Sequence, residues 1–241
     1  MSYVYLVRHG QAGTRDEYDR LSDLGSRQAR MLGEYFAAQQ IAFSAAYSGS
    51  MRRQQETALE VQAAYREMRI HFPEIAISRE WDEFNLDQVY QELAPMMCSD
   101  DPQFRQQYHQ MRAQVRASAG VQESEVHRRW LPCDSQIVGA WVEGRYPYAG
   151  ESWQAFINRV ASFRHGLRNG ADDAKIIVFT SAVPVAIWAG LALEVTDRRI
   201  LRLAGVLQNT AYTVLRLKGD ILRFHEFNCT PHLRTELRTY R

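Results

Sequence analysis

Eight residues indicate how this chain folds: Tyr3-Val4-Tyr5-Leu6-Val7-Arg8-His9-Gly10. The run from Tyr3 to Val7 is short, apolar and rich in residues that favour β-structure, and it ends abruptly at two basic side chains. It therefore predicts a buried strand that opens into a loop at Arg8. Because ligands in α/β sheets bind beyond the carboxyl ends of the strands, this loop is a candidate binding site.

Strand and helix patterns alternate after this first run. Ser22 is a predicted N-cap, since apolar residues recur at helical spacing after it. A strand is then expected at 43–47, a helix at 52–68 and a further strand at 74–78. This β-α-β-α-β order predicts a parallel sheet with helices on both faces.

The later part of the chain returns to strands and helices. Lys175–Thr180 is a near-continuous apolar run, which suits a central strand buried on both faces, and an apolar helix follows it. The segments 205–217 and 220–227 alternate in polarity and are joined by Lys218-Gly219-Asp220, which predicts a hairpin. A helix is also expected to start near Ser152.

The segment from about 86 to 144 has a different character. Glutamine, arginine and methionine are frequent there, and apart from a polar helix at 102–119 no alternation of strand and helix is visible. We interpret this segment as an insertion that caps a site. The expected fold is thus a single α/β domain over residues 1–241. It is a three-layer α/β/α sandwich with a mostly parallel central sheet and a helical cap insertion.

Composition limits the classes of function. Hydrophobic residues make up 46% and charged residues 24% of the 241 residues, values typical of a soluble globular protein. The formal net charge of +1 gives no global basic field, so we expect no nucleic-acid partner. Any site for an anion must be local. No pattern in the sequence specifies an oligomeric state.

The cysteines and the first apolar run bear on the compartment. Cys98, Cys133 and Cys229 form no CxxC pair, and neither they nor the histidines have metal-ligand spacing. An odd number of cysteines without a signal peptide favours a reducing compartment, so we expect the cytoplasm. The apolar run at Tyr3–Val7 is too short to span a membrane, and no membrane partner is expected.

Arginine, histidine and glycine at a strand end are suited to phosphate chemistry. The Arg8 guanidinium can hold a phosphate with two parallel hydrogen bonds. The His9 imidazole can attack phosphorus and carry the group as a phosphohistidine. Gly10 allows a close approach of the backbone. Taken alone, this tripeptide is a weak signal that favours a salt-bridged loop over a phosphate site.

Further motifs follow in order along the chain. They are Leu21-Ser22-Asp23-Leu24-Gly25-Ser26-Arg27-Gln28-Ala29, the segment from Ser48 through Arg53 to Thr57-Ala58, Gly150-Glu151-Ser152 through Phe156 to Arg159-Val160, Gln208-Asn209-Thr210 and Pro231-His232-Leu233. Together with Arg8-His9-Gly10, this series resembles the histidine phosphatase (phosphoglycerate mutase-like) superfamily over nearly the whole chain except the insertion. The mutase-specific segment with tryptophan and asparagine is missing, which favours a phosphatase over a phosphoglycerate mutase.

The resemblance implies roles for two further residues. Arg53 becomes the second phosphate clamp, where otherwise an exposed helix cation would be expected. Glu83, within Trp81-Asp82-Glu83, becomes the general acid that protonates the leaving alcohol and then activates water. Asp82 is the competing carboxylate for this role, and a solvated surface acid is the alternative interpretation of Glu83.

Two departures from the family pattern, at Ser181 and Arg15, bear on the phosphate site, and a further one places Ser50 where proline is usual. Ser181 stands where the second histidine of the family is expected after the central strand. Its hydroxyl can donate one neutral hydrogen bond and cap the next helix, whose first amides, including that of Ala182, are offered to a phosphate. Losing the histidine predicts a rate lower by roughly a hundred- to a thousandfold. Arg15 stands where many members have asparagine, and it either adds a third phosphate contact or faces solvent.

These observations predict a phosphatase that hydrolyses a phosphate monoester through a phosphohistidine on His9. Its partner would be a small phosphorylated substrate. No metal or organic cofactor is expected, because Arg8 and Arg53 supply the positive charge. Ser181 predicts an altered or reduced activity. It also leaves the alternative of a catalytically impaired phospho-ligand-binding protein, a pseudoenzyme.

Overall fold

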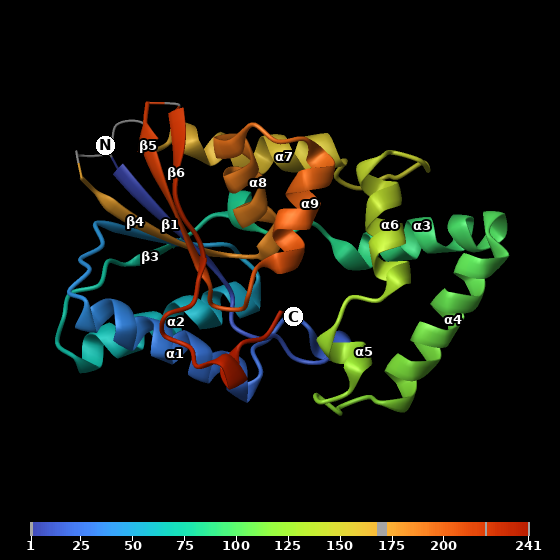
Figure 1. Ribbon diagram of the computed structural model, residues 1–241, viewed down its shortest axis with the longest axis horizontal. Helices are drawn as coiled ribbons and strands as arrows, with labels where there is room; N and C mark the ends of the chain where they lie inside the picture. Colours follow the sequence, from blue (N-terminus) through green and yellow to red (C-terminus); the bar gives the residue numbers. More distant parts are fainter. Residues whose placement is uncertain (1, 168–172, 220, 241) are drawn as a thin grey trace. The chain divides into compact units, whose positions relative to one another are not determined.

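A six-stranded sheet forms the centre of the fold in the computed structural model, which describes residues 2–167, 173–219 and 221–240 (Figure 1). The strands are β1 (Ser2–Arg8), β2 (Ala45–Ser48), β3 (Ile75–Ile77), β4 (Lys175–Thr180), β5 (Tyr212–Lys218) and β6 (Ile221–Cys229). Their order is β3-β2-β4-β1-β5-β6, in which the first four strands are parallel and β5 and β6 are antiparallel. The sheet is therefore mostly parallel, as predicted.

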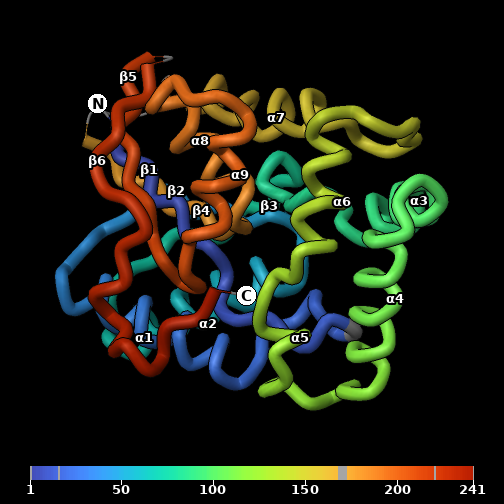
Figure 2. Tube along the Cα trace, turned by 45° about the vertical axis from the view of Figure 1, so that its right-hand side comes forward, coloured from blue at the N-terminus to red at the C-terminus, as the bar shows by residue number. Residues whose placement is uncertain are grey.

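Helices cover both faces of this sheet, which confirms the predicted three-layer α/β/α arrangement. On one face lie α1 (Asp23–Ala38) and α2 (Arg52–Glu67), and on the other lie α8 (Ala182–Leu193) and α9 (Asp197–Val206). The helices α1 and α2 pack side by side, as do α8 and α9 (Figures 1 and 2). One more helix, α7 (Trp153–Ser162), begins next to the predicted start at Ser152.

The structure confirms two local predictions, the N-cap of a helix and the central strand of the sheet. Ser22 is the N-cap of α1, and its Oγ accepts a hydrogen bond from the Gly25 amide at 3.0 Å. The strand β4 is buried from Ile176 to Thr180, because it lies between β1 and β2 inside the sheet and helices cover both faces. The near-continuous apolar run thus formed a central strand, as expected.

The chain divides into two compact units. The first comprises the described residues of 2–13, 19–83 and 159–240, and the second comprises 14–18 and 84–158. The second unit contains the helices α3 (Leu86–Asp100), α4 (Pro102–Ala117), α5 (Glu125–Arg128) and α6 (Pro132–Val142). The polar helix predicted at 102–119 is α4. The other helices of this segment were not predicted.

The hairpin prediction is only partly right. The strands β5 and β6 pair antiparallel as expected, but β5 begins at Tyr212, whereas the prediction started at Gly205. The first residues of that segment end α9, which stops at Val206. A short apolar pattern does not distinguish a helix end from a strand start. Asp220 of the predicted turn lies outside the described residues.

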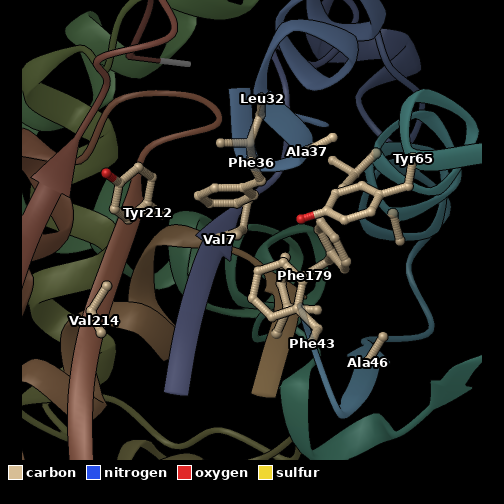
Figure 3. Close-up of a cluster of buried hydrophobic side chains, with 13 residues drawn as sticks. Val7, Leu32, Phe36, Ala37, Phe43, Ala46, Tyr65, Phe179, Tyr212 and Val214 are labelled. Carbon is tan, nitrogen blue, oxygen red and sulfur yellow. The ribbon is translucent and has the colours of Figure 1, made fainter. Parts of the chain in front are cut away.

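An aromatic core fills the space between the sheet and α1 and α2. Phe36, Phe43, Tyr65 and Tyr212 meet there with aliphatic side chains from β1, α1 and β5 (Figure 3). The Phe36 and Phe43 rings pack edge to face with centroids 5.6 Å apart. Such pairs add to the free energy gained by burying apolar surface, so they hold α1 firmly against the sheet.

Candidate active site

The candidate site lies at the carboxyl edge of the parallel strands, within the first unit. Arg8 at the end of β1 pairs with Thr180 at the end of β4, and Ser48 of β2 pairs with Phe179. His9 and Ser181, which follow the first of these pairs, therefore emerge side by side. This is the edge at which ligands bind in α/β sheets.

His9 is held as a neutral imidazole by contacts at both ring nitrogens. The side chain is buried, its Nδ1 lies 2.7 Å from the Gly10 carbonyl oxygen, and its Nε2 accepts from Arg53 Nε at 3.2 Å. Burial, then the charges of Arg53 and Arg8, hold the pKa of His9 well below its usual value of 6.5. Because a carbonyl accepts but cannot donate, the proton belongs on Nδ1, and the lone pair lies on Nε2.

The loop after His9 depends on two glycines that touch. A Cβ atom at Gly10 would lie 2.4 Å from the Gly25 carbonyl oxygen, and one at Gly25 would lie 2.1 Å from the Gln11 carbonyl oxygen. The Gly10 amide also donates to Thr57 Oγ1 at 3.0 Å. The close backbone approach that was expected at Gly10 is confirmed, and it ties the loop to α1 and α2.

Two buried arginines concentrate positive charge around His9. Arg8 and Arg53 are 4% and 5% exposed, which is unusual for guanidinium groups in a nearly neutral protein. Arg8 Nη1 donates to the Leu207 carbonyl oxygen. Arg53 Nη1 forms an ion pair with Asp19 Oδ1 at 2.8 Å, although the Asp19 side chain is 60% exposed. Arg53 is therefore not the exposed cation that its position in a helix would suggest.

Glu83 and Asp82 are held in different ways. Glu83 Oε2 accepts from the Val183 amide at 3.2 Å, in the first turn of α8 directly after Ser181. Both oxygens of Asp82 accept from Ser50, one from its amide and one from its hydroxyl. The carboxylate of Glu83 is thus tied to the helix that starts beside His9, while Asp82 is bound to the loop after β2.

Ser181 does not cap its helix, which corrects one expectation. It occupies the N-cap position of α8, but its side chain makes no capping hydrogen bond. Its Oγ instead accepts from Gln54 Nε2 at 2.8 Å, and both side chains are buried. Ala182 is the first residue of α8, so its amide is among those that have no partner within the helix.

Arg15 belongs to the second unit, and acceptors of that unit hold its guanidinium. Its Nη2 forms an ion pair with Asp134 Oδ2 at 2.6 Å, and its Nη1 donates to the other oxygen of Asp134 at 3.1 Å. Further bonds reach the carbonyl oxygens of Val126 and Arg129. Arg15 is therefore not the solvent-facing cation of the second alternative, while its contact with phosphate stays a prediction. Its role is to join the start of the chain to α6.

Late segments of the chain support the His9 loop. Asn209 Nδ2 donates to the His9 carbonyl oxygen at 3.1 Å, and the Thr210 amide donates to that of Arg8 at 3.1 Å. His232 Nε2 lies 2.9 Å from Thr210 Oγ1. The two motifs at 208–210 and 231–233 are therefore part of the scaffold that fixes the loop.

Sequence reasoning missed three residues that contact this site. Gln54 lies within the motif from Ser48 to Ala58 but at a variable position of it, and Asp19 lies just before the motif that begins at Leu21. No local pattern marks a side chain whose partner is distant in sequence. Arg159 was quoted only as part of a motif. Its Nη1 donates to the carbonyl oxygens of Arg79, Glu80 and Asp82, so it fixes the segment that ends in Glu83.

Comparison with known proteins identifies the family. Residues 4–145 and 134–230 match the profile of the histidine phosphatase superfamily, branch 1. The chain belongs to this superfamily. No curated protein matches the sequence. The family assignment confirms the resemblance deduced from the ordered motifs.

Solved structures of the superfamily share the fold at low identity. A phosphoserine phosphatase from Entamoeba histolytica in complex with 3-phosphoglyceric acid is 15% identical, with a TM-score of 0.60 over 97% of this chain and 100% of that one. An α-ribazole phosphatase from Shigella flexneri is 15% identical, with a TM-score of 0.58 over 95% and 96%. A mycobacterial glucosyl-3-phosphoglycerate phosphatase with inorganic phosphate is 15% identical, with a TM-score of 0.58 over 96% and 99%.

The described residues show neither a metal-binding cluster nor a membrane-spanning helix. They contain no group of three or more His, Cys, Asp or Glu side chains arranged to hold a metal ion. None of the helices in the same residues is both long enough and apolar enough to cross a lipid bilayer.

We predict that Asp19→Asn strengthens the binding of inorganic phosphate by about two- to fivefold. The Asp19 carboxylate occupies a guanidinium nitrogen that a phosphate would use, and exposed ion pairs contribute up to about 1 kcal/mol. Calorimetric titration of phosphate measures the effect. Asp23→Asn is the control, because Asp23 is exposed on α1 and its replacement changes the net charge equally. Equal affinities of the two variants would contradict competition by Asp19.

We also predict that the imidazole of His9 titrates well below pH 6.5. Burial and two neighbouring cations disfavour its protonated form, so acidification must go further before it binds a proton. The shift of its ring C2 proton, followed by NMR and assigned by its loss in His9→Gln, gives the midpoint. A midpoint at or above 6.5 would show that the arginines do not control this group.

Proposed function

We propose that this chain hydrolyses a small phosphate monoester through a phosphohistidine intermediate on His9. One observation carries the proposal: a buried neutral imidazole directs its Nε2 lone pair at Arg53, with Arg8 adjacent. Membership in the histidine phosphatase superfamily supports phosphatase-like activity. The fold is shared with phosphatases whose complexes contain 3-phosphoglyceric acid or inorganic phosphate, which favours a small phosphorylated substrate.

In the first step, His9 Nε2 attacks phosphorus while Arg8 and Arg53 hold the equatorial oxygens. The P–O bond to the alcohol breaks, and Glu83 transfers its proton to the leaving oxygen. In the second step, water attacks the phosphohistidine and gives a proton to the Glu83 carboxylate. The N–P bond breaks, which releases inorganic phosphate and restores neutral His9. The buried guanidiniums stabilise the charge that spreads over the transferred oxygens.

The choice of Glu83 over Asp82 rests on their hydrogen bonds. Ser50 donates to both oxygens of Asp82, which commits this carboxylate to the loop after β2. Glu83 is attached through one oxygen to the first turn of α8, the helix that starts beside His9. In this proposal the two arginines supply the positive charge, so the reaction needs no metal or organic cofactor.

Two further assignments belong to this proposal. We infer that the helical segment of about 86–144 acts as a cap that contributes to substrate choice, because it is the part of the sequence that departs from the shared motifs. The cysteines Cys98, Cys133 and Cys229 are free thiols, which favours a reducing compartment, and we propose the cytoplasm.

Ser181 supports a second candidate function. A neutral hydroxyl replaces a group that otherwise stabilises the transferred phosphoryl, and the site would still bind phosphate through Arg8 and Arg53 without useful turnover. A phospho-ligand-binding pseudoenzyme is therefore the alternative.

A phosphohistidine on His9 is directly testable. We expect a ³²P-labelled phosphate ester to label the protein with a bond that is stable in base and labile in acid. His9→Gln should abolish the label, because its side chain has no nucleophilic nitrogen. His71→Gln, in the loop before β3, serves as the control and should be labelled like the parent. Equal labelling of His9→Gln and the parent would exclude the mechanism.

Turnover of an aryl phosphate separates the two candidate functions. We expect measurable parental hydrolysis that depends on His9. Ser181→His alone should give little gain, because Ser181 is buried against Gln54 and an imidazole needs the space of that side chain. Adding Gln54→Ala should raise the rate of Ser181→His by about tenfold or more. Absence of parental hydrolysis, with phosphate still bound, would favour the pseudoenzyme.

A further inference from the structure

A wholly buried glutamine lies directly behind Ser181. Gln54 belongs to the first turn of α2, and its Nε2 donates to Ser181 Oγ at 2.8 Å and to the Trp81 carbonyl oxygen at 3.2 Å. Its Oε1 is buried without a hydrogen-bond partner among the described residues. An unpaired buried amide oxygen is unfavourable. The Trp81 carbonyl oxygen can only accept a hydrogen bond, however, so the nitrogen of the Gln54 amide must face it.

The hydroxyl of Ser181 retains one uncommitted hydrogen. A serine oxygen has two lone pairs and a single hydrogen, and here one lone pair accepts from Gln54. Within the described residues, the Ser181 hydroxyl donates to no protein acceptor, and the side chain is 1% exposed. Buried donors are nearly always paired in folded proteins. Because this hydroxyl hydrogen has no acceptor in the described part of the protein, we take a bound ligand as its acceptor.

Two neighbouring residues in the first turn of α2 together contact both His9 and Ser181. Arg53 donates through Nε to His9 Nε2 at 3.2 Å, and its neighbour Gln54 holds Ser181. His9 and Ser181 directly follow a pair of residues on adjacent parallel strands, so both groups stand at one strand edge. A phosphoryl group on His9 would therefore lie at the edge from which the Ser181 hydroxyl emerges.

We propose that Gln54 is a positioning residue for phosphoryl transfer. By donating to Ser181 Oγ, it restricts the rotation of the hydroxyl and directs the hydroxyl hydrogen towards an oxygen of the phosphoryl group. The Gln54–Ser181 pair thus provides a neutral donor at the place where the family resemblance expects a histidine. This inference rests on the proposed function and adds the residue that makes Ser181 effective in it.

Four variants test the pair: Gln54→Met, Ser181→Ala, the double variant and Gln62→Met. Methionine keeps the length of glutamine but removes its donor, and Gln62 is a matched control two turns further along α2. Orthovanadate, which becomes five-coordinate like the transition state, is titrated beside inorganic phosphate. Thermal melts report stability, and aryl phosphate hydrolysis gives kcat and KM.

We expect Gln54→Met to weaken vanadate binding by about tenfold and phosphate binding by less than about threefold. The value of kcat should fall about tenfold with KM nearly unchanged, because the donor acts mainly in the transition state. In the Ser181→Ala background, Gln54→Met should have no further effect on vanadate, since the hydroxyl that it positions is gone. Gln62→Met should behave like the parent.

Several outcomes would overturn the inference. In the first, the losses of vanadate affinity caused by Gln54→Met and Ser181→Ala multiply in the double variant. In the second, Gln54→Met lowers the melting temperature without changing the ratio of vanadate to phosphate affinity. If His9 is labelled but this ratio is unchanged, the inference fails and the proposed function stands. If His9 is not labelled but the ratio changes as expected, the proposed function fails and the pair still acts as a phosphoryl-oxygen donor. A parent that neither binds vanadate nor is labelled at His9 would exclude both.

Discussion

The parallel pairing of β1 with β4 is the constraint on which the candidate site depends. Its register puts Arg8 beside Thr180, so the residues that follow, His9 and Ser181, leave the sheet together. A shift of one residue would turn every side chain of β1 to the opposite face and would expose the buried apolar set. The apolar contacts that fix the register therefore also fix the distance between the two halves of the site.

Local electrostatics give this nearly neutral protein a site for an anion. Arg8 and Arg53 are buried beside an imidazole, and their charges act in surroundings where solvent screens them little. In the proposed function, burial and the same two cations keep His9 neutral, and the two cations attract a phosphate dianion. In that proposal, one arrangement both binds the substrate and keeps the nucleophile unprotonated. The exposed carboxylate of Asp19 partly neutralises the positive charge of Arg53.

Patterns local in sequence predicted much of the fold, and pairings distant in sequence were missed. The β1 and β4 strands, the cap of α1 by Ser22 and the mostly parallel sheet followed from apolar runs and spacing. The ordered motifs indicated Arg53 because they carry family information that its polar helix does not. Gln54 and the acceptors of Arg15 were missed, since they depend on partners 127 and about 110 to 120 residues away. The start of β5 was misjudged because a helix end imitated strand alternation.

The contact between Gly10 and Gly25 makes the effects of substitutions at these two positions depend on each other. Each glycine leaves room for the backbone of the other segment, so a side chain at either position forces the same separation of the loop and α1. Once the first substitution has opened this contact, the second has less left to disrupt. The free-energy costs of the two substitutions are therefore less than additive. Neither position can change freely alone, and a chain that lost one glycine would experience weaker selection to keep the other.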